Sequence, residues 1–221
     1  MEKEKQVLVI FPHPDDEAFG VSGTIATYIK NGTPVTYACL TLGEMGRNMG
    51  SPVFANRETL PQIRKRELQE AAAAVGITDL RMMGVRDKTV EFIKEEELVG
   101  MMSSLLEELK PSLVITFYPG YSVHPDHEAC GAAVVKAVGM LPKEHRPKLH
   151  CVAFSKGCEQ ELGKPDIVNR ITEVLPQKLA CLRAHRSQTE QMAGEMEEKL
   201  EKGDEQMLNW IQNERFWTYK F

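Results

Sequence analysis

The segment Val7–Gly20 constrains the fold of this chain more than any other. It starts with the apolar run Val7–Phe11, which has the composition of a strand buried on both faces of a parallel sheet. The polar stretch His13–Glu17 follows at once, and Pro14 suits the first turn of the helical pattern that comes next. Ligands bind open α/β sheets at the carboxyl ends of the strands. The sequence therefore predicts a binding site at His13–Glu17.

The residue types in this stretch favour a metal. His13 and Asp16 are three residues apart across a tight turn, so their side chains are expected to converge, whereas Asp15 points another way. Imidazole and carboxylate groups are common zinc ligands, and a third protein ligand would leave one position open for water. Capping of the helix is the alternative role for Asp15, Asp16 and Glu17. The histidine at the mouth of a buried strand makes metal binding the better interpretation.

Length, charge and cysteine content exclude several classes of protein. The 221 residues fit a single domain, 1–221, with a sizeable core. The net charge of −5 gives no support for a nucleic-acid partner, and no apolar run is long enough to cross a bilayer. The amino terminus lacks a signal-peptide pattern, and five scattered cysteines fit reduced thiols. We expect a cytoplasmic protein without a membrane or nucleic-acid partner.

Strand and helix patterns alternate along the chain. This order predicts an α/β fold with a mostly parallel sheet, helices on both of its faces and an active site at the carboxyl ends of the strands. The last strand alternates like an edge strand and could contribute to a subunit interface. The expected strands are 7–11, 34–42, 80–83, 112–118, 148–154, 166–174 and 215–221, and the expected helices are 18–30, 58–75, 95–109, 128–140, 176–184 and 195–206.

A second strand end repeats the arrangement of the first. The apolar segment 112–118 leads into His124-Pro125-Asp126-His127 and then into an Ala-rich helix. Carboxyl ends of parallel strands share one edge of the sheet, so this corner can supply the missing third ligand. The pattern alone leaves open whether His124 or His127 binds the metal.

These residues also fit the hydrolysis of an amide. Such a reaction needs an activated water, a group that stabilises charge on oxygen, and a proton for the leaving nitrogen. Asp15, beside the metal but not bound to it, can accept the proton of the water. A protonated His124 can donate to the tetrahedral oxyanion, and Asp126 nearby favours that charged form.

The two motifs, HPDDE at His13–Glu17 and HPDH at His124–His127, resemble those of the LmbE/PIG-L family of metal-dependent N-deacetylases. Their order and separation, the strand before each motif, and the late His185-Arg186-Ser187-Gln188 match the family over nearly the whole chain. The resemblance implies a Rossmann-like sheet and hydrolysis of the N-acetyl group of N-acetylglucosamine derivatives.

Site roles follow from the resemblance position by position. It implies zinc as the cofactor, with other divalent metals such as Fe²⁺ also compatible. Asp15 would be the general base, and His124 would stabilise the transition state while Asp126 holds its ring. The implied metal ligands are His13, Asp16 and His127.

Within the family, the chain is most similar to the bacillithiol-pathway enzymes that deacetylate N-acetylglucosaminyl malate. Another N-acetylglucosamine derivative or a chito-oligosaccharide is the alternative substrate. Because family members are often oligomeric, a homo-oligomer is expected. Tyr121, on the loop before the second motif, is a candidate substrate contact.

Further residues on the same rim are candidates for the substrate pocket. Arg47 lies in a Gly-rich loop, and an arginine fork binds carboxylates such as those of malate. Asp87 follows a strand and can accept hydrogen bonds from sugar hydroxyls. Arg64 either contributes to the site or lies on a solvated helix face. His185 has either a role in or behind the pocket or a purely structural one.

Two other classes of function compete with this interpretation. A Mg²⁺- or Mn²⁺-dependent phosphoryl hydrolase would use the carboxylates of Asp15, Asp16 and Glu17, but magnesium prefers oxygen ligands to histidines. A non-catalytic metal-binding or scaffold protein would not need Asp15 and the His124–Asp126 pair in addition to its ligands. A metal-dependent hydrolase therefore explains more of the residues.

Overall fold

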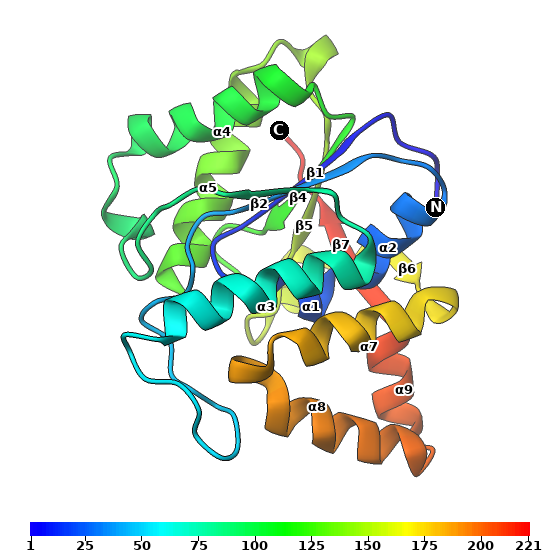
Figure 1. The fold of residues 1–221 in the computed structure, drawn as a ribbon. Coiled ribbons are helices and arrows are strands. Elements are labelled where there is room, and N and C mark those ends of the chain that lie inside the picture. Colours follow the sequence, from blue (N-terminus) through cyan, green and yellow to red (C-terminus); the bar gives the residue numbers. More distant parts are fainter.

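The fold is a seven-stranded sheet with helices on both faces, in a computed structural model that describes all 221 residues (Figure 1). The strand order is β3-β2-β1-β4-β5-β7-β6, and the five strands from β3 to β5 are parallel. The predicted Rossmann-like fold is confirmed. The strands are β1 (Val7–Phe11), β2 (Val35–Cys39), β3 (Asp79–Met82), β4 (Leu113–Phe117), β5 (Lys148–Val152), β6 (Ile167–Arg170) and β7 (Asn213–Thr218).

Nine α-helices and three short 3-10 helices connect these strands. The 3-10 helices are Val90–Phe92, Lys143–His145 and Thr172–Val174. The α-helices are α1 (Asp16–Gly20), α2 (Ser22–Lys30), α3 (Leu60–Val75), α4 (Glu95–Leu109), α5 (Pro125–Met140), α6 (Cys158–Leu162), α7 (Leu175–Ala184), α8 (Arg186–Glu201) and α9 (Glu205–Gln212).

The central strands are buried on both sides because their residues alternate between two cores. In β1, Val7, Val9 and Phe11 face the core formed with α2, α3 and α7, whereas Leu8 and Ile10 face the core formed with α4 and α5. Each buried aliphatic or aromatic side chain contributes about 1.5–3 kcal/mol to stability. This explains why the strand is apolar throughout rather than alternating.

The predicted helix 18–30 is two helices in the structure. α1 ends at Gly20 and α2 starts at Ser22, with Val21 in a non-helical conformation (φ −140°, ψ −6°) between them. The backbone N–H groups of Gly23 and Thr24 donate to the carboxylate of Glu214, at 3.0 and 2.6 Å. A carboxylate from the far end of the chain thus stabilises a new helix start, which no local pattern announces.

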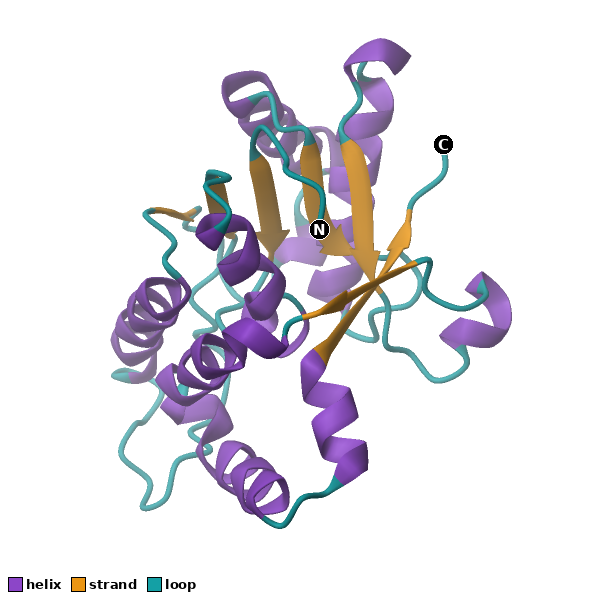
Figure 2. Ribbon diagram, turned by 90° about the vertical axis from the view of Figure 1, so that its right-hand side faces the viewer, coloured by secondary structure: helices purple, strands orange, loops and turns teal.

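The carboxyl-terminal part differs most from expectation. The predicted helix 195–206 is wrong, since α8 ends at Glu201 and α9 begins at Glu205, where the side chain of Asp204 accepts from the Met207 N–H at 2.9 Å. The predicted edge strand is also wrong. β7 lies between β5 and β6 and is antiparallel to both, so its pairing groups are covered within the chain (Figure 2).

The helices and cysteines agree with the expectations from composition. None of the helices combines the length and apolar composition needed to span a bilayer. All five cysteines are free and buried. Burial raises the pKa of the Cys151 thiol above its ordinary value, so this group stays protonated.

We expect Glu214→Ala to cost about 3–5 kcal/mol of unfolding free energy, because it leaves a buried charge without its partner. Lys178 Nζ lies 2.7 Å from Glu214, and both side chains are buried. Urea denaturation measures the effect. The matched control is Glu173→Ala, which removes an exposed ion pair with Lys30 and should leave the unfolding free energy almost unchanged. Equal losses in both variants would contradict the prediction.

Candidate metal centre and active site

The site lies where the two central strands β1 and β4 end. These strands pair in parallel, with Val7 opposite Leu113, so the segments that follow them emerge on the same rim of the sheet. As a result, His13 Nδ1 lies 3.1 Å from His127 Nε2, although 114 residues separate the two in sequence. The structure therefore brings together the two predicted corners.

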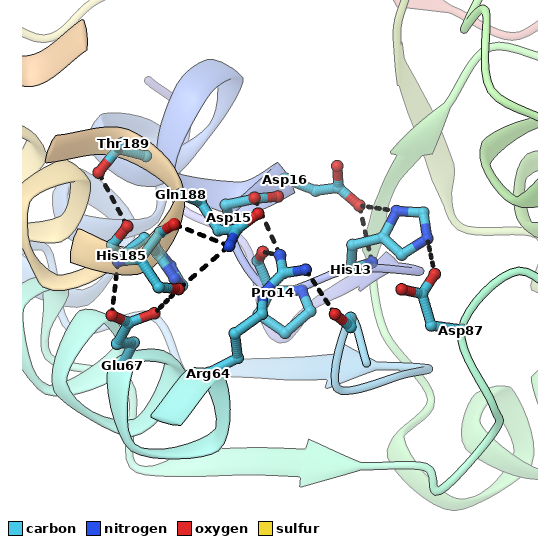
Figure 3. A network of polar contacts seen from close by, with 12 residues as sticks. His13, Pro14, Asp15, Asp16, Arg64, Glu67, Asp87, His185, Gln188 and Thr189 are labelled. Carbon is cyan, nitrogen blue, oxygen red and sulfur yellow. Dashed lines mark hydrogen bonds and ion pairs between the residues drawn. The ribbon is translucent and has the colours of Figure 1, made fainter. Parts of the chain in front are cut away.

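Backbone geometry at the first corner separates the two aspartates. Asp15 has a left-handed conformation with φ 109°, and α1 begins only at Asp16. The sequence predicts Pro14 in the first turn of this helix. In the structure Pro14 precedes the helix. Asp16 points towards His13 and His127, whereas Asp15 turns towards Arg64 (Figure 3).

At the second corner, α5 begins three residues earlier than predicted. His124 is its N-cap, and the His124 Nδ1 accepts from the backbone N–H of Asp126 at 3.2 Å. Pro125 occupies the first turn, where its lack of an N–H costs nothing. His127 consequently lies inside the first turn of the helix, directed towards His13 and Asp16.

Three side chains at this rim have the spacing of metal ligands. His127 Nε2 lies 3.2 Å from Asp16 Oδ1, and His13 Nδ1 lies 3.6 Å from Asp16 Oδ2. Ligand atoms of a tetrahedral zinc ion, at about 2.0–2.1 Å from the metal, are about 3.4 Å apart. A nitrogen of His124 is close to those of His13 and His127 as well, so proximity alone does not choose between His124 and His127.

The partners of the imidazoles decide which nitrogens face the centre. His13 Nε2 lies 3.2 Å from both Asp87 Oδ1 and Asp126 Oδ2, and His127 Nδ1 lies 3.1 Å from the Ser122 carbonyl. Those contacts assign the N–H of each ring to the outer partner, as is usual for metal-bound histidines. Two lone pairs then face one another across 3.1 Å, which is the arrangement that a cation satisfies. The residues present therefore fit a divalent metal.

The surrounding carboxylates attract positive charge to this point. Although burial opposes it, contacts with Asp126 and Asp87 raise the pKa of His13 to about 10. Burial likewise disfavours the ionised form of Asp87, but the hydrogen bond from His13 lowers the pKa of Asp87 to about 2. Asp16 also has a lowered pKa, because the attraction of His127 and His13 outweighs its burial. The carboxylates around the centre thus favour positive charge there.

Asp15 lies next to this centre in a different environment. Burial raises the pKa of Asp15 to about 6, against the attraction of Arg64, whose Nη2 lies 3.0 Å from Asp15 Oδ2. A pKa near neutrality suits a general base. Arg64 is buried and also donates to the carbonyls of Pro14 and Gly43 (Figure 3), so it is no solvated surface charge.

Asp126 contacts His124 through its backbone, which the sequence did not predict. Its backbone N–H, not its carboxylate, holds the His124 ring, while the carboxylate binds His13 and the Lys88 N–H. Burial and the neighbouring His13 and His127 rings lower the pKa of His124. Asp126 does favour the charged form of His124, as expected, but burial and the two neighbouring rings outweigh its effect on the pKa.

A cavity of about 600 Å³ opens on the site from the β5–β7 side. Asp15, Asp16 and His127 lie in its wall, and the remaining wall is mostly apolar, with several aromatic side chains. The aromatic lining residues are Phe19, Phe117, Phe154, Trp210 and Trp217.

The four predicted substrate residues lie outside this wall. Asp87 and Arg64 stand behind His13 and Asp15, in contact with them. Arg47 is exposed on its loop, where its carbonyl accepts from Gln188 Nε2 at 2.8 Å. The Tyr121 hydroxyl donates to Glu161 at 2.9 Å. The structure thus brings none of them to the cavity surface directly.

Sequence reasoning missed one buried group next to Asp15. Glu17 is fully buried and contacts His185, Tyr37 and the Asp15 N–H. A signal was present, because Tyr37 carries a hydroxyl inside a fully buried strand, and such a group needs a buried partner. The role of the Ser122 carbonyl had no such signal, since backbone carbonyls are the same in every residue.

The comparison with known families identifies the chain. The model of the PIG-L family, described as GlcNAc-PI de-N-acetylase, matches residues 8–138. This chain belongs to the PIG-L family. The match runs from β1 into α5 and so includes both corners of the site.

Individual relatives are similar to this chain along nearly its full length. A probable N-acetyl-alpha-D-glucosaminyl L-malate deacetylase 2 from Bacillus cereus is 55% identical over 218 residues, which are 99% of each chain. A protein of the same description from Bacillus subtilis is 53% identical, again over 99% of each chain. The solved N,N'-diacetylchitobiose deacetylase from Pyrococcus horikoshii has the same fold, with a TM-score of 0.71 at 24% identity, covering 98% of this chain and 84% of that one.

We expect His127→Ala and His13→Ala to abolish tight binding of one divalent ion per chain, because each removes one nitrogen from the centre. Zinc titration followed by metal analysis measures this. His145→Ala is the control, since His145 belongs to a separate 3-10 helix, and it should bind like the wild type. Unchanged stoichiometry and affinity in His127→Ala would show that His127 is not a ligand.

Proposed function

We propose that this chain is a zinc-dependent deacetylase that releases acetate from N-acetylglucosaminyl malate. The observation that carries the substrate assignment is the 55% identity, along 99% of both chains, with the Bacillus cereus protein of that description. The ligand spacing at the rim supports zinc, because one histidine pair and one carboxylate are a common zinc set with a free coordination position. A cytoplasmic location and a homo-oligomeric state stay predictions.

The residues would divide the work of amide hydrolysis among them. His13, Asp16 and His127 would hold the ion, which when bound acidifies a water molecule and polarises the amide carbonyl. Asp15 would accept the proton of that water, and Arg64 keeps its carboxylate in place.

His124 would complete the site with its free Nε2. Because Nδ1 accepts from the Asp126 N–H, the neutral ring carries its proton on Nε2. That N–H would donate a hydrogen bond to the developing oxyanion. The leaving amine would receive its proton from Asp15, which holds the proton taken from the water.

The substrate would enter through the aromatic cavity. Its apolar wall suits the carbon face of a sugar ring, and Arg215 in the same wall offers a guanidinium for a carboxylate of malate. Arg47, on the neighbouring exposed loop, is a second candidate for that contact. Tyr121 remains a candidate for sugar hydroxyls at the edge of the site, whereas Asp87, buried behind His13, would act by orienting that ring.

The decisive experiment is an acetate-release assay of the zinc-loaded protein on three substrates. We expect N-acetylglucosaminyl malate to give a kcat/KM at least tenfold above those for diacetylchitobiose and N-acetylglucosamine, because only malate offers carboxylates to the arginines. A higher value for diacetylchitobiose would replace the substrate assignment. Absence of acetate from all three, with zinc bound, would argue against deacetylation.

We expect Asp15→Asn to retain zinc but lose about 10²–10⁴-fold in kcat, since the amide cannot accept a proton. Zinc affinity should stay near the wild-type value because Asp15 does not face the ligand nitrogens. The control is Asp79→Asn, a half-exposed carboxylate in β3 that contacts Arg81 and lies outside the site. Turnover of Asp15→Asn at the wild-type rate would remove Asp15 from the role of base.

A further inference from the structure

Glu17 is the one acid of the HPDDE motif that the proposed chemistry leaves unused. Its side chain is completely buried, in a place where an apolar residue would avoid the cost of removing a charge from water. Buried carboxylates of this kind persist where their hydrogen bonds serve a purpose beyond packing. The partners of Glu17 indicate that purpose.

Four groups from separate parts of the chain converge on the Glu17 carboxylate. Oε1 lies 2.5 Å from Nε2 of His185, which stands between α7 and α8, and 3.9 Å from the Cys181 sulfur. Oε2 accepts from the Tyr37 hydroxyl in β2 at 2.9 Å and from the Asp15 backbone N–H at 3.2 Å. Tyr37 thus shares Oε2 with the Asp15 N–H, and His185 holds the other oxygen of the carboxylate.

The contact with Asp15 coincides with an unusual backbone conformation. Asp15 is one of only four non-glycine residues with a positive φ, at 109°, and such a conformation costs of order 1–3 kcal/mol unless its surroundings support it. Glu17 supports it from the backbone side, and Arg64 binds the side chain at 3.0 Å. The base is therefore held at two points.

We propose that Glu17 is a positioning residue, which accepts the Asp15 N–H and thereby fixes the left-handed turn that aims the Asp15 carboxylate at the reaction centre. Tyr37 and His185 hold Glu17 in place for this purpose. The inference rests on the proposed function in one respect, the assignment of Asp15 as the base. Catalytic groups tolerate little displacement, and an error of about 1 Å can cost about 100-fold in rate.

Glu17→Ala and Glu17→Gln test the inference, with Glu67→Gln as the matched control. Glu67 is another buried carboxylate of the same region, but it accepts from Ser187 N and Oγ, at 2.7 and 2.6 Å, and does not contact Asp15. We expect Glu17→Ala to lower kcat by about 10- to 100-fold, with KM and zinc affinity within about twofold of wild type. Glu17→Gln should lose less, because its amide oxygen still accepts the Asp15 N–H.

A crystal structure of the zinc-loaded Glu17→Ala protein gives a readout that needs no substrate. We expect φ of Asp15 to leave the left-handed region and the contact between Asp15 and Arg64 to lengthen beyond 3.5 Å. An unchanged Asp15, or an equal loss of kcat in Glu67→Gln, would overturn the inference. Should Glu17→Ala fail to fold, Glu17→Met, which keeps much of the volume but offers no oxygen to the Asp15 N–H, carries both readouts, and a wild-type kcat with an unmoved Asp15 would overturn the inference.

The two proposals fail in distinguishable ways. Wild-type protein that binds zinc but releases no acetate would contradict the proposed function, while the position of Asp15 in the variant structure would still decide the role of Glu17. Conversely, full turnover in Glu17→Ala would leave the deacetylase assignment intact and exclude only the positioning role.

Discussion

The parallel pairing of β1 with β4 is the constraint on which the rest of the structure depends. Because the two strands run in the same direction, the segments that follow them lie at the same edge of the sheet. The pairing requires both strands to be buried on both faces, which the two helix layers achieve. The apolar interior and the polar rim are therefore two results of one arrangement of strands.

Around the rim, polar groups form successive layers. His13, Asp16 and His127 meet at the centre, Asp87 and Asp126 stand behind His13, and each layer determines the proton positions of the layer inside it. A comparable layering surrounds the base, with Arg64 on one side and Glu17 on the other. The site thus depends on residues from nearly every connection at this end of the sheet.

The parts of this architecture that depend on local apolar patterns could be predicted from the sequence. The strands β1 and β4 and the helix α4, whose predicted range 95–109 matches the structure, follow from strong apolar patterns, and the meeting of the two corners follows from topology. The carboxylate of Asp126 could not be placed, because it depends on which of several nearby groups comes closest. The position of β7 could not be predicted either, since an edge strand and an internal strand differ only in whether a neighbour, here β6, pairs with them.

The internal position of β7 has a consequence for how the protein unfolds. β6 is attached to the sheet only through β7, and β7 also delivers Glu214 to the start of α2. Detachment of β7 therefore frees β6 and at the same time leaves the N–H groups that open α2 without their acceptor. Segments from the two halves of the chain should consequently lose their structure in one cooperative step.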